Sequence, residues 1–102
     1  MHGLIEQYRS QIAELCRLHG VKRLELFGSA SRGDFKADTS DVDFFVAFTD
    51  SGWKDSSTRY FGLLHGLEDL LHRRVDLVER GAVKNRYFLE VADQHRNLLY
   101  AA

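Results

Sequence analysis

The chain has 102 residues, with 14 Lys and Arg against 15 Asp and Glu, and its formal net charge is −1. This balance excludes an overall positive field that would draw the protein onto nucleic acid or an anionic membrane, and no apolar run reaches the roughly 20 residues that span a bilayer. A content of 44% hydrophobic and 28% charged residues is typical of one globular domain over residues 1–102. The single cysteine, Cys16, excludes an internal disulfide, and the N-terminus shows no apolar leader, so we expect a cytoplasmic protein.

The first segment has the spacing of an amphipathic helix. Its apolar residues recur at three- and four-residue steps from Leu4 to Cys16, which places them on one side of a helix, and Gly20 supplies a stop. Residues 21–27 then read VKRLELF and predict a short strand. Residues 28–40 predict a loop or a brief helical turn, and its length in so small a domain indicates a function.

Residues 41–48 carry the strongest strand pattern in the chain. In the run DVDFFVAF, alternate side chains belong to opposite faces, and both faces are apolar beyond Asp43. This pattern is typical of a strand that is buried on both sides except at its first turn. Two carboxylates, Asp41 and Asp43, stand at that polar entrance.

The second half of the chain predicts a further helix, a strand and a helix. Leucines at helical spacing run to Leu71, and the helix begins near Ser57 or Thr58, whose hydroxyls suit a cap. Residues 74–79 predict a third strand, and residues 83–91 predict a final helix. The tail, NLLYAA, is consistent with an edge strand or with a helical extension.

Three acidic residues lie inside otherwise apolar strands, namely Asp41, Asp43 and Asp76. Residues two apart on a strand point the same way at a spacing of roughly 6.5 to 7 Å, so Asp41 and Asp43 can converge on one or two hard cations. If Asp76 lies on the neighbouring strand, it completes a carboxylate triad for two-metal phosphoryl or nucleotidyl transfer. The alternative is that these aspartates cap loops or pair with arginines such as Arg73 and Arg74, a role that suits Asp76 taken alone equally well.

A Gly-Ser pair follows the first predicted strand. Backbone N–H groups of Gly28 and Ser29, in a turn that leads into a helical turn, would form a nest for an anion. Arg32 could add a charge-assisted contact. A Gly-Ser pair more commonly marks a tight turn, and its significance here comes from its position between one strand and the carboxylate pair on the next.

The run LELFGSASRGDFKADTSDVDFFV, followed by RVDLVE, resembles the minimal nucleotidyltransferases of the DNA polymerase β-like superfamily. The resemblance extends from the first helix to about Tyr100. It implies an α+β fold in which a small mixed β-sheet is flanked by helices, with ATP as substrate and two Mg²⁺ ions as cofactors. Eleven residues separate Ser29 from Asp41, one more than is usual in the family.

By motif position, the resemblance also implies the roles of individual residues. Gly28 and Ser29 would hold the triphosphate with Arg32 nearby, and Asp41 and Asp43 would ligate the metal ions. Asp76 would match the third carboxylate, which ligates a metal ion and activates the acceptor hydroxyl. The expected reaction is an in-line attack of that hydroxyl on the α-phosphorus of ATP, with pyrophosphate leaving.

The shortness of the chain bears on the acceptor. Only 26 residues follow Asp76, so we expect the acceptor site to be shallow or to be supplied by another chain. Stand-alone members of this size are similar to antitoxins that act on HEPN-domain toxins, which implies transfer of AMP to a toxin tyrosine within a hetero-oligomer.

Two further functions stay open. One is a binding antitoxin that blocks its partner by contact, and the other is an enzyme that modifies a small molecule or RNA. The near-neutral charge disfavours a broad RNA surface. Tyr87, Phe88 and Tyr100 could form a partner-binding patch, although core packing explains Phe88 equally well.

Overall fold

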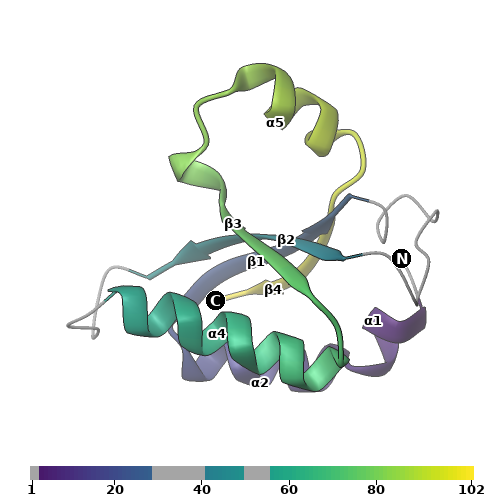
Figure 1. Ribbon diagram of the computed structural model, residues 1–102, viewed down its shortest axis with the longest axis vertical. Helices are drawn as coiled ribbons and strands as arrows, with labels where there is room; N and C mark the ends of the chain where they lie inside the picture. The colour runs from purple at the N-terminus through teal and green to yellow at the C-terminus, as the bar shows by residue number, and fades with distance from the viewer. Residues whose placement is uncertain (1–2, 29–40, 50–55) are drawn as a thin grey trace.

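The computed structural model describes residues 3–28, 41–49 and 56–102, which form an α+β fold around one mixed sheet (Figure 1). In chain order the elements are α1 (Gly3–Gln7), α2 (Arg9–Leu18), β1 (Val21–Phe27), β2 (Val42–Phe48), α4 (Ser56–Leu71), β3 (Val75–Glu79), the 3₁₀ helix η1 (Arg80–Ala82), α5 (Arg86–Asp93) and β4 (Asn97–Ala101). The strands lie in the order β3-β2-β1-β4. Strand β1 is antiparallel to β2 and β4, whereas β2 and β3 are parallel. The predicted mixed sheet flanked by helices is therefore confirmed.

Helices α2 and α4 lie together against one face of this sheet, and α5 lies on its other side (Figure 1). Alternation along β2 directs Val42, Phe44 and Val46 into the helix layer, where none is more than 2% exposed. They join a single core with residues of α1, α2, α4 and the other strands, which include Ile5, Ile12, Cys16, Leu24, Leu26, Leu63, Leu67, Leu71, Val75, Leu77 and Leu99.

The first predicted helix is in fact two helices. Tyr8 separates α1 from α2 with φ −104° and ψ 12°, and its N–H donates to the carbonyl of Ile5 (3.2 Å). Apolar periodicity runs through this break because Ile5 and Ile12 both reach the same core; the pattern reports which face is buried and not whether the backbone is continuous. Gly20, with φ +66°, follows the end of α2 as predicted.

The C-terminal segment resolves the alternative left open for the tail. Residues 97–101 form β4, which pairs with β1 at the edge of the sheet, so the tail is a strand. Helix α5 begins at Arg86, three residues after the predicted start. Asn85 caps it by accepting a hydrogen bond from the Phe88 N–H (3.1 Å).

The sheet face opposite α2 and α4, here termed the open face, carries the candidate chemistry. By register and alternation it consists of Arg23, Glu25 and Phe27 of β1, Asp43, Phe45 and Ala47 of β2, and Asp76 and Val78 of β3. Burial on both sides of β2, as predicted, holds at Phe45 (1% exposed) but not at Ala47, which is exposed. Among the residues described, no helix is both long and apolar enough to cross a membrane.

Candidate active site

Two carboxylates stand side by side on neighbouring strands. Asp43 of β2 and Asp76 of β3 are Cα partners in the parallel register. Strands in a sheet are about 4.8 Å apart, and paired residues share a face. Both side chains therefore belong to the open face, where Asp43 is half-buried and Asp76 is exposed. The position of Asp76 on the neighbouring strand meets the condition on which the carboxylate triad depended.

Hydrogen bonds to the β3 backbone on both sides of Asp76 hold this strand in place. The Val42 N–H donates to the Arg74 carbonyl (3.1 Å), which ties the start of β2 to the start of β3. Helix α4 holds β3 from beneath at two points: Glu68 Oε2 accepts from the Val75 N–H (3.2 Å), and the Tyr60 hydroxyl donates to the Leu77 carbonyl. The residues before and after Asp76 are thus both attached to α4.

Gly28 lies directly against the Asp43 carboxylate. It follows β1, whose last residue, Phe27, pairs with Asp43, and it has φ +74°. A Cβ atom at this position would lie 2.1 Å from Asp43 Oδ2, so only glycine leaves room for the carboxylate beside the backbone. The structure therefore brings Gly28, Asp43 and Asp76 together at one end of the open face, whereas Ser29 and Arg32 lie outside the described residues.

Asp41 occupies a different position from the other two aspartates. It precedes β2 and is exposed. Within residues 3–28, 41–49 and 56–102, no three His, Cys, Asp or Glu side chains converge closely enough to form a metal-binding group.

The proposed structural alternative, pairing with arginine, finds little support at Asp41 and Asp76. Neither side chain has a hydrogen bond or an ion pair with another described residue. The Nε atom of Arg73 donates to the Leu71 carbonyl (3.2 Å). An exposed carboxylate with no partner among the described residues is open to a cation or to a proton donor.

The charges of the site affect the pKa of Tyr60 on α4. Burial raises the pKa of the Tyr60 phenol, and the negative charges of Asp76 and Glu79 raise it further. The phenol therefore stays protonated and keeps its donor role toward β3. The donor set of the site fits Mg²⁺, because carboxylate oxygens are the protein ligands that this hard cation prefers.

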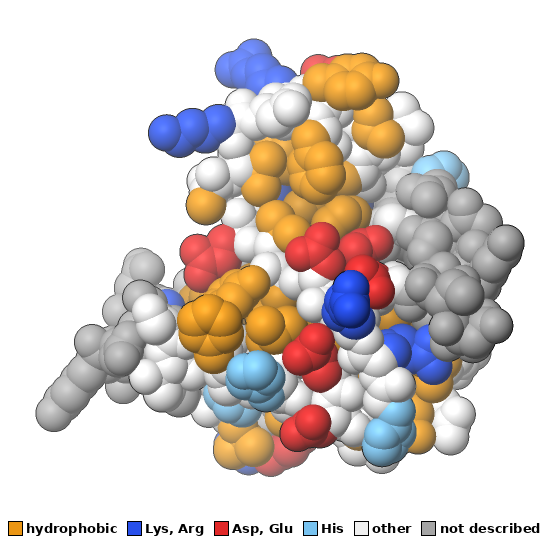
Figure 2. Space-filling model, in the orientation of Figure 1, with side chains coloured by type: hydrophobic (Ala, Val, Ile, Leu, Met, Phe, Trp, Pro, Cys, Tyr) orange, Lys and Arg blue, Asp and Glu red, His pale blue; other side chains and the backbone are white. Residues whose placement is uncertain are grey.

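An aromatic cluster borders the carboxylates. The rings of Phe27 and Phe45 stack at 3.9 Å between centroids, and Phe88 of α5 meets both edge-on at 6.1 and 6.3 Å. Figure 2 shows acidic side chains gathered in the middle of the view, below the apolar side chains that surround α5. Phe88 thus packs α5 against the open face while 39% of its surface stays exposed, and its role in a partner-binding patch stays a prediction.

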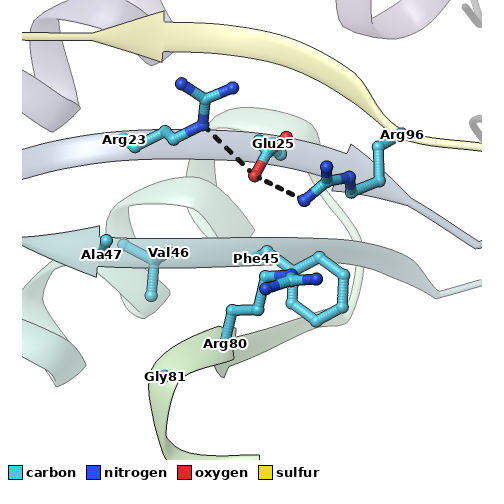
Figure 3. Close-up of a pocket in the computed structure, with 8 residues that line it drawn as sticks. All are labelled: Arg23, Glu25, Phe45, Val46, Ala47, Arg80, Gly81 and Arg96. Carbon is cyan, nitrogen blue, oxygen red and sulfur yellow. Dashed lines mark hydrogen bonds and ion pairs between the residues drawn. The ribbon is translucent and has the colours of Figure 1, made fainter. Parts of the chain in front are cut away.

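Beyond the aromatic cluster lies a hollow that sequence reasoning missed. It has a volume of about 360 Å³, and its charged lining consists of Arg23, Glu25, Arg80 and Arg96 (Figure 3). We call it the arginine hollow. A charged residue in an alternating strand is normally read as solvent-exposed, so the burial of Glu25 (6% exposed) on the open face had no sequence signal.

Comparison with known proteins places this arrangement in context. The sequence model of a family described as "Nucleotidyltransferase domain" matches residues 9–99. The protein adenylyltransferase MntA of Thermococcus cleftensis is 40% identical over 72 residues, which cover 71% of this chain and 69% of that protein.

Two solved structures share the fold. A minimal nucleotidyltransferase superposes with a TM-score of 0.73 at 29% identity, covering 90% of this chain and 89% of the other. A chain of the complex between an MNT antitoxin and a tri-AMPylated HEPN toxin from Shewanella oneidensis gives a TM-score of 0.64 at 20% identity, covering 95% and 72% of the two chains.

Proposed function

Because the chain belongs to the nucleotidyltransferase domain family, we propose that it transfers AMP from ATP to a hydroxyl group of a partner HEPN toxin. The proposed acceptor is a tyrosine hydroxyl, and the transfer makes this protein the antitoxin of its partner. The observation that carries this proposal is the register pairing of Asp43 with Asp76, with Gly28 against Asp43. Two adjacent carboxylates suit the metal ions of a nucleotidyl transfer, and a glycine beside them lets the backbone approach closely.

Mg²⁺ would be held by Asp41, Asp43 and Asp76, as two ions. When bound, it neutralises the charge of the triphosphate and stabilises the charge that develops on the attacking and leaving oxygens. The carboxylate donor set supports this assignment. The tethers from α4 to β3 hold Asp76 in place beside Asp43.

The chain's own residues have distinct tasks in the proposed reaction. In this proposal the backbone at Gly28 would bind the triphosphate of ATP, with Ser29 and Arg32 assigned to the same anion. Asp76, which is exposed, accepts the proton of the acceptor hydroxyl at its carboxylate. The hydroxyl oxygen then forms a bond to the α-phosphorus as the bond to pyrophosphate breaks.

The acceptor is proposed to be a HEPN toxin. The relative from Thermococcus cleftensis is named a protein adenylyltransferase, and the Shewanella oneidensis complex contains an AMPylated HEPN toxin. The open position of Asp76 supports a macromolecular acceptor, because a protruding tyrosine side chain reaches an exposed carboxylate without entering a deep pocket.

A second candidate function is neutralisation by contact alone. Helix α5 supports it, because Tyr87 (76% exposed), Phe88 (39%) and Val91 (46%) present apolar surface that does not depend on the aspartates. In that case the protein would inhibit its partner through a tight complex, with catalysis secondary.

The deciding experiment combines the protein with Mg²⁺, ATP labelled at the α-phosphate and its proposed partner, a HEPN protein. We expect the mass of one or more AMP groups on a tyrosine of the HEPN protein, and no label with the Asp41→Asn/Asp43→Asn variant. Asp69→Asn is the matched control, because Asp69 is an exposed carboxylate on α4. If no label appears and the double variant inhibits the HEPN protein equally well, contact is the mechanism and the transferase proposal fails.

A further inference from the structure

The arginine hollow lies on the same face as the candidate active site, at the opposite end. Along β2 the open-face residues are Asp43, Phe45 and Ala47. The hollow therefore begins at Phe45, two residues from Asp43, and extends to Ala47, which is about 13 Å from Asp43 along the strand. Its floor is formed by Phe45 and Ala47, and its sides are formed by β1, η1 and the residue that precedes β4. One extended ligand can therefore contact both the carboxylates and the arginine hollow.

The charges that line the hollow do not balance. Glu25 Oε1 lies 3.3 Å from Arg23 Nε and 3.4 Å from the Nη1 atom of Arg96. Asp93 contacts Arg96 Nε at 3.4 Å and also accepts from Arg80. In the part of the chain that the structure describes, three guanidinium groups thus face two carboxylates, which leaves one positive charge in excess.

The donors are also in excess. Each guanidinium has five N–H donors in a fixed fork, and these ion pairs use one or two on each arginine. Arg80 is held with its guanidinium carbon 5.8 Å above the Phe45 ring centroid, facing into the hollow (Figure 3). Arginine forks of this kind bind carboxylates in a bidentate manner.

We propose that the arginine hollow binds a carboxylate of the acceptor protein and so aligns the acceptor hydroxyl with Asp76. This inference rests on the proposed function. The triphosphate is assigned to Gly28, at the far end of the open face, and the nucleoside carries no charge. The excess positive charge of the hollow is therefore available to an acidic group of the acceptor. An extended segment spans about 3.3 Å per residue, which places the acidic residue two to four positions from the modified one.

The test measures binding without catalysis. The Nε–H signals of Arg23, Arg80 and Arg96 are followed by NMR while the peptide acetyl-Tyr-Gly-Glu-amide, its glutamine counterpart or AMP is added. We expect the glutamate peptide to shift these signals at concentrations at least fivefold lower than the glutamine peptide. Equal effects of the two peptides, or tighter binding of AMP to the same signals, would overturn the proposal.

Variants separate the hollow from the rest of the surface. Among the described residues Arg23 has one ion pair, to Glu25, and Glu25 keeps Arg96 as a partner when Arg23 is replaced. For Arg23→Gln we therefore expect the fold to persist and peptide binding to weaken at least fivefold. Arg17→Gln is the control, since Arg17 is an exposed arginine on α2 with one glutamate partner. Equal peptide binding by the two variants contradicts the proposal.

The transfer assay then distinguishes this proposal from the proposed function. With an acceptor protein that is modified, Arg23→Gln should raise KM for that acceptor at least fivefold while KM for ATP stays unchanged. An unchanged acceptor KM overturns the role of the hollow and leaves the transferase activity standing. If the wild-type protein transfers no AMP yet binds the glutamate peptide selectively, only the proposed function fails.

Discussion

Asp43 has the position in which a small chemical change should separate activity from stability. Asp43→Asn keeps the shape of the side chain but removes one of two adjacent negative charges, because Asp76 is its register partner. We expect AMP transfer to fall at least about 1,000-fold and the free energy of unfolding to change by less than about 1 kcal/mol. Transfer is measured by label incorporation and stability by urea unfolding.

The result for Asp43 is interpreted beside Asp69→Asn, which removes a carboxylate from the exposed side of α4 and should leave both quantities unchanged. Transfer retained by Asp43→Asn would remove this carboxylate from the proposed reaction. A large loss of stability would instead assign it a structural role.

Gly28 should be intolerant of any side chain. In Gly28→Ala the new Cβ would lie 2.1 Å from Asp43 Oδ2, on a backbone with φ +74°, so either the carboxylate or the turn must move. We expect transfer to fall at least about 100-fold and the free energy of unfolding to fall by about 1 kcal/mol or more. Gly3→Ala is the control, because a Cβ on Gly3 meets open space; equal behaviour of the two variants would contradict the close approach.

Among the elements, helix α4 does more than cover the core. Through Tyr60 and Glu68 it holds β3 at the residues that flank Asp76. In Tyr60→Phe the Leu77 carbonyl loses its donor, and we expect the free energy of unfolding to fall by about 1 kcal/mol. We also expect kcat for transfer to fall about 3- to 10-fold, with KM for ATP unchanged, because Asp76 becomes less well positioned.

Tyr8→Phe provides the comparison for Tyr60. Tyr8 is also half-buried at the edge of the core, and its hydroxyl has no hydrogen bond with a described residue. A kcat for Tyr60→Phe equal to that for Tyr8→Phe would show that the tether does not act on the site.

The elements themselves could be predicted to different extents. The run DVDFFVAF specified β2 through its alternation, but both of its faces are apolar beyond Asp43, so it did not specify which face meets the helices. The pairing of Asp43 with Asp76 could not be predicted, because it depends on where β3 begins relative to β2. That register is set by the contacts of Arg74 and Glu68, which are tertiary.

At the scale of the whole molecule, the sequence predicts the helices that cover one sheet face but not the residues of the open face. Apolar spacing predicts the layer of α2 and α4, whereas the open face combines carboxylates, aromatic rings and arginines from segments far apart in the chain. Arg23 and Arg96 meet only because β4 pairs with β1 and brings Arg96 to Glu25. A cluster of charged residues that are distant in the sequence could therefore not be predicted from local sequence patterns.

The core beneath that face predicts how the whole molecule responds to alkaline pH. Burial raises the pKa of the Cys16 thiol to about 12, from 9.0 in the unfolded chain. Since the folded pKa is the higher one, the associated stability is fully present below pH 9 and is lost as the pH rises toward 12. Between pH 8 and 10.5 the loss is about 1 to 2 kcal/mol.

Urea unfolding at a series of pH values measures this loss, and Cys16→Ala isolates it. The variant leaves a small cavity and should be less stable at pH 8, but its stability should fall less steeply with pH because the thiol is gone. Tyr60, whose pKa is also raised, contributes equally to both proteins and cancels in the difference. Parallel pH profiles for the two proteins would show that the thiol ionises as easily in the folded core as in the unfolded chain, contrary to its complete burial between α2 and the sheet.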